Sequence, residues 1–192
     1  MGTKTKWKRI SKVGKFKKSS RPSSDYKETK EKIEKIFKTK KDRVKCFEIL
    51  ACLSKSPHFI GCFSQDDLVK LELSYPCYMI VNTDSRGEKG SHWLALKLDS
   101  SVVEIFDPLG FEIFNYKQIP CHLLEFIHDH ANDKKLKISP RIQSDSSSNC
   151  ALYCIFYIFY RNFNSFNRLC SLFSKNLKEN DDRLKLLVDV CN

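Results

Sequence analysis

The sequence predicts an α+β domain, and three observations lead to that class. Between Ile142 and Tyr160 a polar, Ser-rich segment changes into a nearly continuous apolar run, which predicts a buried helix that begins near Cys150. Three β-prone runs separated by short turns lie between residues 75 and 107, which indicates an antiparallel meander. Segments with helical spacing lie on both sides of these runs, so strands and helices are segregated along the chain.

The folded part is expected to begin at Cys46, after a basic arm. The first element is a helix over Phe47–Leu53 that ends before Pro57. The next segment, His58–Phe63, reads H-F-I-G-C-F, and we interpret its Gly61 as a turn.

Three strands are expected next, at Tyr75–Asn82, Ser91–Leu98 and Val102–Asp107. The R-G-E-K-G segment at residues 86–90 joins the first strand to the second, and Asp99–Ser101 joins the second strand to the third. These connections favour a central antiparallel or mixed sheet, against which the buried helix would pack.

Three further segments complete the domain. Cys121–His130 has helical spacing, and the basic stretch Lys134–Arg141 is expected to be extended as it leads to the buried helix. A helical tail is expected from Ser165, and its L-K-L-L-V-D-V end at residues 184–190 is expected to pack on the core.

The positive charge of the chain is concentrated in its first 45 residues. They hold 18 Lys and Arg against 5 Asp and Glu, whereas residues 46–192 hold 16 against 18. We therefore divide the chain into an arm, 1–45, and a domain, 46–192. The first 25 residues of the arm are expected to be disordered, and 26–44 to form at most a solvated helix. Such an arm is typical of DNA binding, although a nuclear localisation signal or a solubilising segment would look the same.

The cysteine content and the hydropathy of the sequence indicate the cellular compartment. Nine cysteines, an odd number, show no paired C-x-x-C metal spacing, so we expect reduced thiols in a cytosolic or nuclear setting and no metal. The Lys-rich beginning lacks the apolar region of a signal peptide, and no apolar run reaches the length of a membrane span. We expect a protein without membrane contact, acting as a monomer.

Four polar residues could form a catalytic site around a cysteine. Cys150 at a helix N-terminus would be favoured as a thiolate by the helix dipole. His92 begins one expected strand and Asp107 ends the next, so a short turn between these strands can bring base and carboxylate together. Gln143 could donate to an oxyanion. Each residue alone also fits a structural role: a core cysteine, a strand histidine, a turn aspartate and a loop glutamine.

Four sequence blocks occur in an order that resembles the adenovirus endopeptidase (adenain) family. They are H-F-I-G-C-F, M-I-V-N-T-D-S-R-G-E-K-G-S-H-W-L-A-L, E-I-F-D-P-L-G-F and I-Q-S-D-S-S-S-N-C-A-L-Y-C. The resemblance covers roughly residues 47–161 and implies a papain-like cysteine protease fold. It also implies a general base at His92, an orienting acid at Asp107, an oxyanion-hole side chain at Gln143 and a nucleophile at Cys150.

The chain departs from this family at three positions. Asp107 stands where the family usually has Glu, and Ala151 follows the nucleophile where the family usually has Gly. Asn132 stands where the family cysteine holds an activating peptide by a disulfide, with Cys121 nearby. The resemblance implies DNA and an activating peptide as cofactors, and DNA contact is expected through the basic arm.

The expected function is a cysteine endopeptidase that cleaves viral capsid and core precursors, after Gly in Gly-containing motifs, during virion maturation. The resemblance places it in the virion and the host nucleus. One alternative is an isopeptidase for ubiquitin-like or SUMO-like proteins from the same protease clan. The other is a catalytically silent DNA-binding virion protein.

Overall fold

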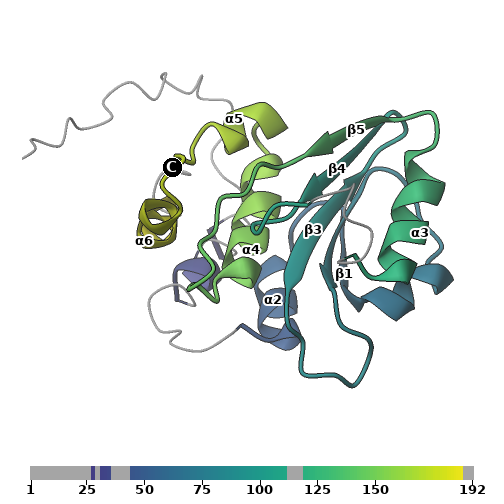
Figure 1. Ribbon diagram of the computed structural model, residues 1–192, viewed down its shortest axis with the longest axis horizontal. Coiled ribbons are helices and arrows are strands. Elements are labelled where there is room, and N and C mark those ends of the chain that lie inside the picture. Colours follow the sequence, from purple (N-terminus) through teal and green to yellow (C-terminus); the bar gives the residue numbers. More distant parts are fainter. Residues whose placement is uncertain (1–26, 29–30, 36–43, 112–118, 188–192) are drawn as a thin grey trace, which may run out of the picture.

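The computed structural model describes residues 27–28, 31–35, 44–111 and 119–187. A five-stranded mixed sheet lies at its centre, with helices against both faces (Figure 1). This arrangement confirms the predicted α+β class. The elements in chain order are α2 (Cys46–Leu53), β1 (Phe59–Ser64), η1 (Gln65–Lys70), β2 (Cys77–Asn82), β3 (Trp93–Leu98), β4 (Val102–Phe106), α3 (Cys121–Ala131), β5 (Lys135–Ile138), α4 (Cys150–Arg161), α5 (Phe166–Cys170) and α6 (Leu177–Leu187).

The strand order is β1-β2-β3-β4-β5. The predicted meander is confirmed, because β2, β3 and β4 pair antiparallel. Both edge strands pair in parallel with their neighbours, β1 with β2 and β5 with β4. The interpretation of Gly61 as a turn was wrong. Gly61 lies inside β1 with φ +142°, where the register with β2 is irregular, so its conformational freedom accommodates a bulge and not a chain reversal.

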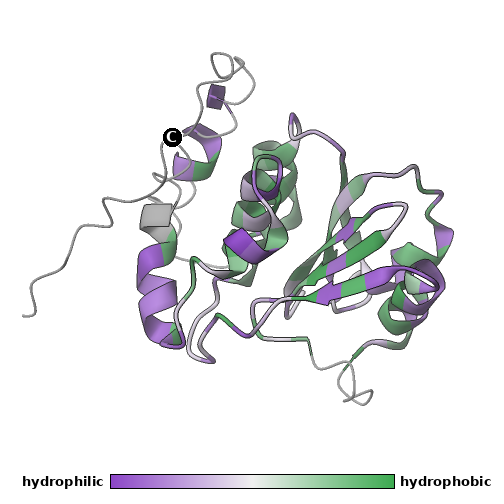
Figure 2. Cartoon of the chain, turned by 90° about the horizontal axis from the view of Figure 1, so that it is seen from above, coloured by the Kyte–Doolittle hydropathy of each residue, from purple (hydrophilic) through white to green (hydrophobic). Residues whose placement is uncertain are grey.

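Two hydrophobic layers cover the sheet, which explains why β2 is buried along its whole length. Tyr78 and Ile80 face a layer built largely by α2 and α4, whereas Met79 and Val81 face a layer built by η1 and α3. In Figure 2, α4 is coloured largely as hydrophobic, whereas α6 is coloured largely as hydrophilic. The site described below lies at the end of the sheet where β3 begins and β4 finishes.

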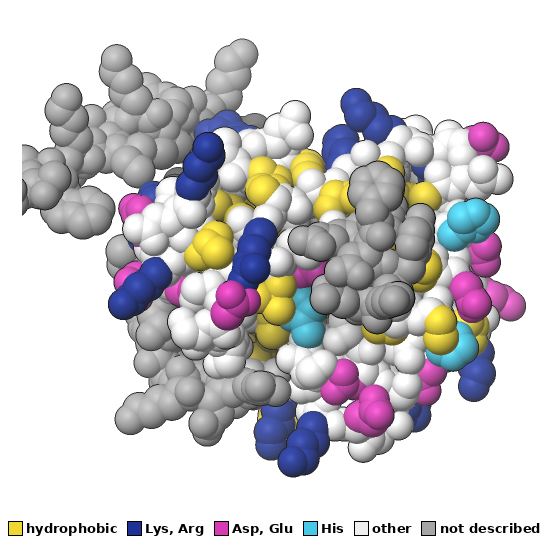
Figure 3. Space-filling view, in the orientation of Figure 1, with side chains coloured by type: hydrophobic (Ala, Val, Ile, Leu, Met, Phe, Trp, Pro, Cys, Tyr) yellow, Lys and Arg dark blue, Asp and Glu magenta, His cyan; other side chains and the backbone are white. Residues whose placement is uncertain are grey.

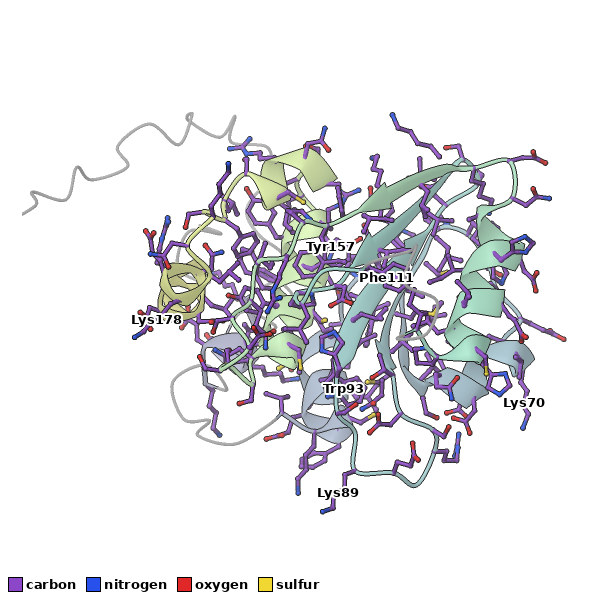
Figure 4. The ribbon with its side chains drawn as sticks, in the orientation of Figure 1. Lys70, Lys89, Trp93, Phe111, Tyr157 and Lys178 are labelled. Carbon is purple, nitrogen blue, oxygen red and sulfur yellow. The ribbon has the colours of Figure 1, made fainter. Side chains whose placement is uncertain are left out.

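Helix α4 is the central helix of the first layer, and all of its residues from Cys150 to Tyr160 are buried. A helix that is apolar on every side requires neighbours all round, and α2, β3 and α5 supply them. Its predicted start at Cys150 is confirmed. Tyr157 stacks on Phe106 of β4 with ring centroids 4.6 Å apart, and Figure 4 shows Tyr157 between α4 and the sheet.

A buried ion pair fixes the far end of α4. Glu104 of β4 is 1% exposed and accepts two hydrogen bonds from Arg161, at 2.8 and 3.0 Å, and one from the Tyr157 hydroxyl at 3.0 Å. Lys137 of β5 lies 3.2 Å away. Burial alone would raise the pKa of Glu104, but the hydrogen bonds and charge of Arg161 outweigh it and lower that pKa.

The arm and the tail both contribute to the core. Residues 31–35 are helical as predicted, but the helix is not merely solvated, because Ile33 is 1% exposed and packs in the same layer as α4. The prediction for the first 25 residues lies outside the described part of the chain, and the boundary at residue 45 stays a prediction. Leu184 of α6 is buried, as predicted for the tail, and residues 188–190 lie outside the description. Among the described residues, no helix is long and apolar enough to cross a membrane.

Candidate active site

His92 and Asp107 meet at one end of the inner strands β3 and β4. His92 directly precedes β3 and Asp107 directly follows β4, and the antiparallel register pairs Ala95 with Phe106 close by. His92 Nε2 donates to Asp107 Oδ1 at 2.7 Å, and both side chains are largely buried. The predicted approach of base and carboxylate is therefore confirmed.

The Asp107 carboxylate is oriented by its own turn. The Leu109 N–H donates to Asp107 Oδ1 at 2.9 Å, the same oxygen that faces the imidazole. The buried Ser139 hydroxyl accepts from the Asp107 N–H at 2.9 Å and donates to the Asp107 carbonyl at 3.0 Å. Ser139 follows β5 and lies 32 residues away in sequence, so no local pattern could have identified it.

The environment of His92 favours its protonated form. Burial lowers its pKa, but hydrogen bonds and electrostatic attraction to the Asp107 carboxylate and the Cys150 sulfur outweigh burial and raise the pKa to about 9. Because Nε2 is taken by Asp107, the other ring nitrogen, Nδ1, is the one left for the thiol. At neutral pH the imidazole therefore carries the proton that a leaving group would need.

Cys150 is the first residue of α4 and is buried. Asn149 precedes it at the N-cap without a side-chain capping bond, so the first turn of α4 relies on other groups or on a ligand. Cys154, one turn further on, is 0% exposed and belongs to the core. Its Sγ donates to the Trp93 carbonyl at 3.4 Å and thereby ties α4 to the strand that follows His92.

Gln143 lies between the loop of the acid and the loop of the nucleophile. Its backbone N–H donates to the Pro108 carbonyl at 2.9 Å, and its side-chain Nε2 donates to the Ser147 carbonyl at 2.8 Å. The side chain is 2% exposed, and its Oε1 has no hydrogen-bond partner. An amide nitrogen has two N–H groups, so Gln143 retains donor capacity beyond the bond to Ser147.

A groove of about 490 Å³ opens beside Cys150. Its walls include Trp93, Ala151 and the loop at 84–91, and Figure 4 shows Trp93 above the loop that carries Lys89. Gly90 in this loop has φ +77°, and a Cβ there would lie 2.6 Å from the Asn82 amide nitrogen. The second glycine of R-G-E-K-G is thus required by both backbone and packing.

A second hollow, of about 340 Å³, lies beside the His92–Asp107 pair. His92 and Asp107 line it together with Leu109 and Phe111, whereas Cys150 lines the first groove. The thiol and the His92–Asp107 pair therefore border two different openings. Within the described residues, no cluster of His, Cys, Asp or Glu is arranged to hold a metal.

Comparison with known proteins identifies the family of the chain. The family described as adenovirus endoprotease matches residues 59–177, a range that contains all four predicted site residues. The similar proteins include three that are each named protease, and the chain spans about half the length of these relatives. They come from bovine adenovirus 7 (32% identical, over 42% of this chain and 44% of the relative), porcine adenovirus A serotype 3 (30%, 53% and 55%) and bovine adenovirus 2 (30%, 57% and 58%).

Proposed function

Because this chain belongs to the adenovirus endoprotease family, we propose that it is a cysteine endopeptidase that cleaves viral precursor proteins during virion maturation. One observation carries the proposal. His92 is bound to Asp107 at 2.7 Å and also interacts with the thiol of Cys150, at the start of the buried helix α4. Acyl transfer by a cysteine needs a thiol that contacts a base, and a carboxylate that orients this base.

The reaction proceeds through a thioester. The Cys150 thiolate attacks the scissile carbonyl, and the carbonyl oxygen becomes an oxyanion that accepts from Gln143 and from the Cys150 backbone N–H. The His92 imidazolium then gives its proton to the leaving amine. Water, deprotonated by His92, releases the acyl group and restores the thiol. Asp107 keeps the imidazole in place and compensates its charge.

The substrate is an extended polypeptide cleaved after Gly in Gly-containing motifs. Trp93 and Ala151 line the groove beside Cys150, and their bulk favours residues without large side chains near the scissile bond. The Ala151 methyl group fills space that glycine would leave open. One hollow beside Cys150 and a second beside the His92–Asp107 pair support an endopeptidase rather than an enzyme that acts only on chain ends.

DNA stimulates the enzyme through the basic arm. On the face shown in Figure 3, Lys and Arg side chains of the described residues are interspersed with Asp and Glu, whereas residues 1–45 carry a balance of +13. An activating peptide would have to bind without the disulfide of the family, because Asn132 stands at that position, immediately after α3. The enzyme acts as a monomer in the virion and the host nucleus.

The deciding experiment measures cleavage of Gly-Gly-containing peptides and labelling by a thiol-reactive peptide probe, with and without DNA. Cys150→Ala should abolish both, and His92→Ala should abolish cleavage and strongly slow labelling. Cys121→Ala is the matched control, since Cys121 is exposed and lies outside both hollows. Cleavage of ubiquitin- or SUMO-derived substrates instead of the peptides would favour the isopeptidase. Labelling that does not depend on His92 would favour a silent DNA-binding protein.

A further inference from the structure

Helix α6 contacts the loop that joins Gln143 to Cys150. The buried Asn180 donates from Nδ2 to the Ile142 carbonyl at 2.9 Å, on the N-terminal side of Gln143. Asp181 accepts from the Ser144 backbone N–H at 3.2 Å and from the Ser144 hydroxyl at 2.5 Å, on its C-terminal side. Both neighbours of Gln143 are therefore held by one helix.

Asp181 also reaches the nucleophile helix. Its Oδ1 accepts from the Tyr153 hydroxyl at 3.0 Å, and the same hydroxyl lies 3.4 Å from the Ile142 carbonyl. One carboxylate thus joins the Ser-rich loop to α4 three residues after Cys150. Asp181 accepts three hydrogen bonds from the described residues, and they link α6, the Ser-rich loop and α4 at one side chain.

The loop itself needs such a link. Residues 144–149 are four serines, an aspartate and an asparagine, whose side chains bond equally well to several local backbone conformations. Within the loop, Ser147 N–H donates to the Ser144 carbonyl at 3.2 Å, and Gln143 Nε2 donates to the Ser147 carbonyl at 2.8 Å. The position of Ser144 therefore sets the position of Ser147, and Ser147 orients the Gln143 amide.

We propose that Asp181 is a positioning residue that holds the Gln143 amide where it can donate to the oxyanion. This role rests on the proposed peptidase function and adds to it a determinant beyond residue 177, where the family match ends. Asp181 does not contact substrate. It acts on the reaction through Ser144 and Tyr153, so its removal should weaken oxyanion binding and leave the Cys150–His92 pair intact.

The test uses the full chain and three measurements on Asp181→Ala. These are kcat and KM for a Gly-containing peptide, the inhibition constant of a peptide aldehyde, and the alkylation rate of Cys150 by iodoacetamide. The aldehyde adduct is a tetrahedral hemithioacetal whose oxygen occupies the position of the oxyanion, whereas alkylation forms no such oxygen. We expect kcat to fall about 10- to 100-fold and the inhibition constant to rise by a similar factor, with KM and alkylation within about 2-fold of the parent.

Controls separate positioning from folding. Asp182→Ala removes the same charge from the next, exposed position of α6 and should leave all three measurements unchanged. Asp181→Asn keeps the shape of the side chain, and Ser144→Ala removes one of the donors to Asp181. Both provide milder variants if Asp181→Ala lowers the melting temperature of the protein. The Gln143→Ala and Asp181→Ala effects on kcat should be far from additive, because both act through one donor.

Three results would overturn the proposal. Cleavage and alkylation that fall in parallel would mean a general structural role, and unchanged cleavage in all Asp181 variants would mean no role. A parent protein that neither cleaves peptides nor shows alkylation dependent on His92 would instead remove the proposed peptidase function itself. That outcome is recognised before any Asp181 variant is compared.

Discussion

The carboxylate of Asp107 lies 2.7 Å from Nε2 of His92, and this contact helps to raise the pKa of the imidazole to about 9 against the opposing effect of burial. In the proposed mechanism, the protonated imidazole supplies the leaving amine with a proton. We therefore expect kcat/KM to decline as the pH rises through about 9. In Asp107→Asn the negative charge beside His92 is lost, so the decline of kcat/KM should begin at lower pH. We also expect kcat to fall roughly 10- to 100-fold. A pH profile on a fluorogenic peptide measures both, and an unmoved alkaline limb would contradict the assignment.

Gly90→Ala should deform the groove beside Cys150. Its φ of +77° strains any L residue, and its new Cβ would meet the Asn82 amide at 2.6 Å. Gly87→Ala is the matched control, because Gly87 has φ +90° in the same loop but nothing lies within 4 Å of its Cβ position. We expect each to cost about 1–3 kcal/mol of strain in the free energy of unfolding. KM should rise only in Gly90→Ala, and equal KM values for the two variants would exclude the steric contact.

Ser139→Ala should reduce activity without touching a reacting group. Its hydroxyl bonds the Asp107 N–H and carbonyl at 2.9 and 3.0 Å, and both residues are buried. Removal leaves these backbone groups unpaired, at a cost of about 1–3 kcal/mol in the free energy of unfolding by urea. We expect kcat to fall by about 10-fold as the carboxylate loses its alignment with His92. Ser139→Thr retains a hydroxyl and should recover part of the loss.

Local patterns predicted the parts of the site that local chemistry specifies. The start of α4 at Cys150 followed from the change of polarity at Asn149, and the meeting of His92 with Asp107 followed from two strands joined by a short turn. The parallel pairing of β1 was missed because Gly61 resembles a turn residue in isolation. Only its partner strand shows that it accommodates a bulge.

Contacts between distant residues left no sequence signal. Ser139 bonds Asp107 across 32 residues, and Asp181 bonds Ser144 across 37, through side chains that are ordinary at the surface of any helix or loop. Ile33 lies in a highly charged segment, yet it packs in the core because the layer that contains α4 offers an apolar surface there. Such placements depend on the tertiary fold and not on periodicity.

Deletion of residues 1–26 should remove the proposed stimulation by DNA and retain basal turnover. This segment holds 9 Lys and Arg against 1 Asp and Glu, and the deletion spares Ile33, which the core needs. Binding that depends on released counterions weakens steeply with salt, so stimulation of the full chain should fall between about 50 and 200 mM salt. Peptide turnover is measured for both proteins with and without duplex DNA. Equal stimulation of the two would place the DNA contact on residues 27–192.

Glu104→Gln should destabilise the fold more than any surface substitution. The change leaves the guanidinium of Arg161 largely buried without its countercharge, and loss of one partner of a buried pair costs about 3–5 kcal/mol. The pKa of Glu104 is lowered in the folded state, so its stabilising contribution is present above the ordinary value of 4.5 and is lost as the pH falls through the lower folded value. In urea unfolding at neutral pH, the free energies of unfolding of parent and variant should therefore differ widely. This difference should become smaller as the pH falls. Glu179→Gln, in a half-exposed pair with Arg183, provides the control and should change stability by less than about 1 kcal/mol at either pH. A gap for Glu104→Gln that stays constant with pH would show that Glu104 does not stabilise the fold through its charge.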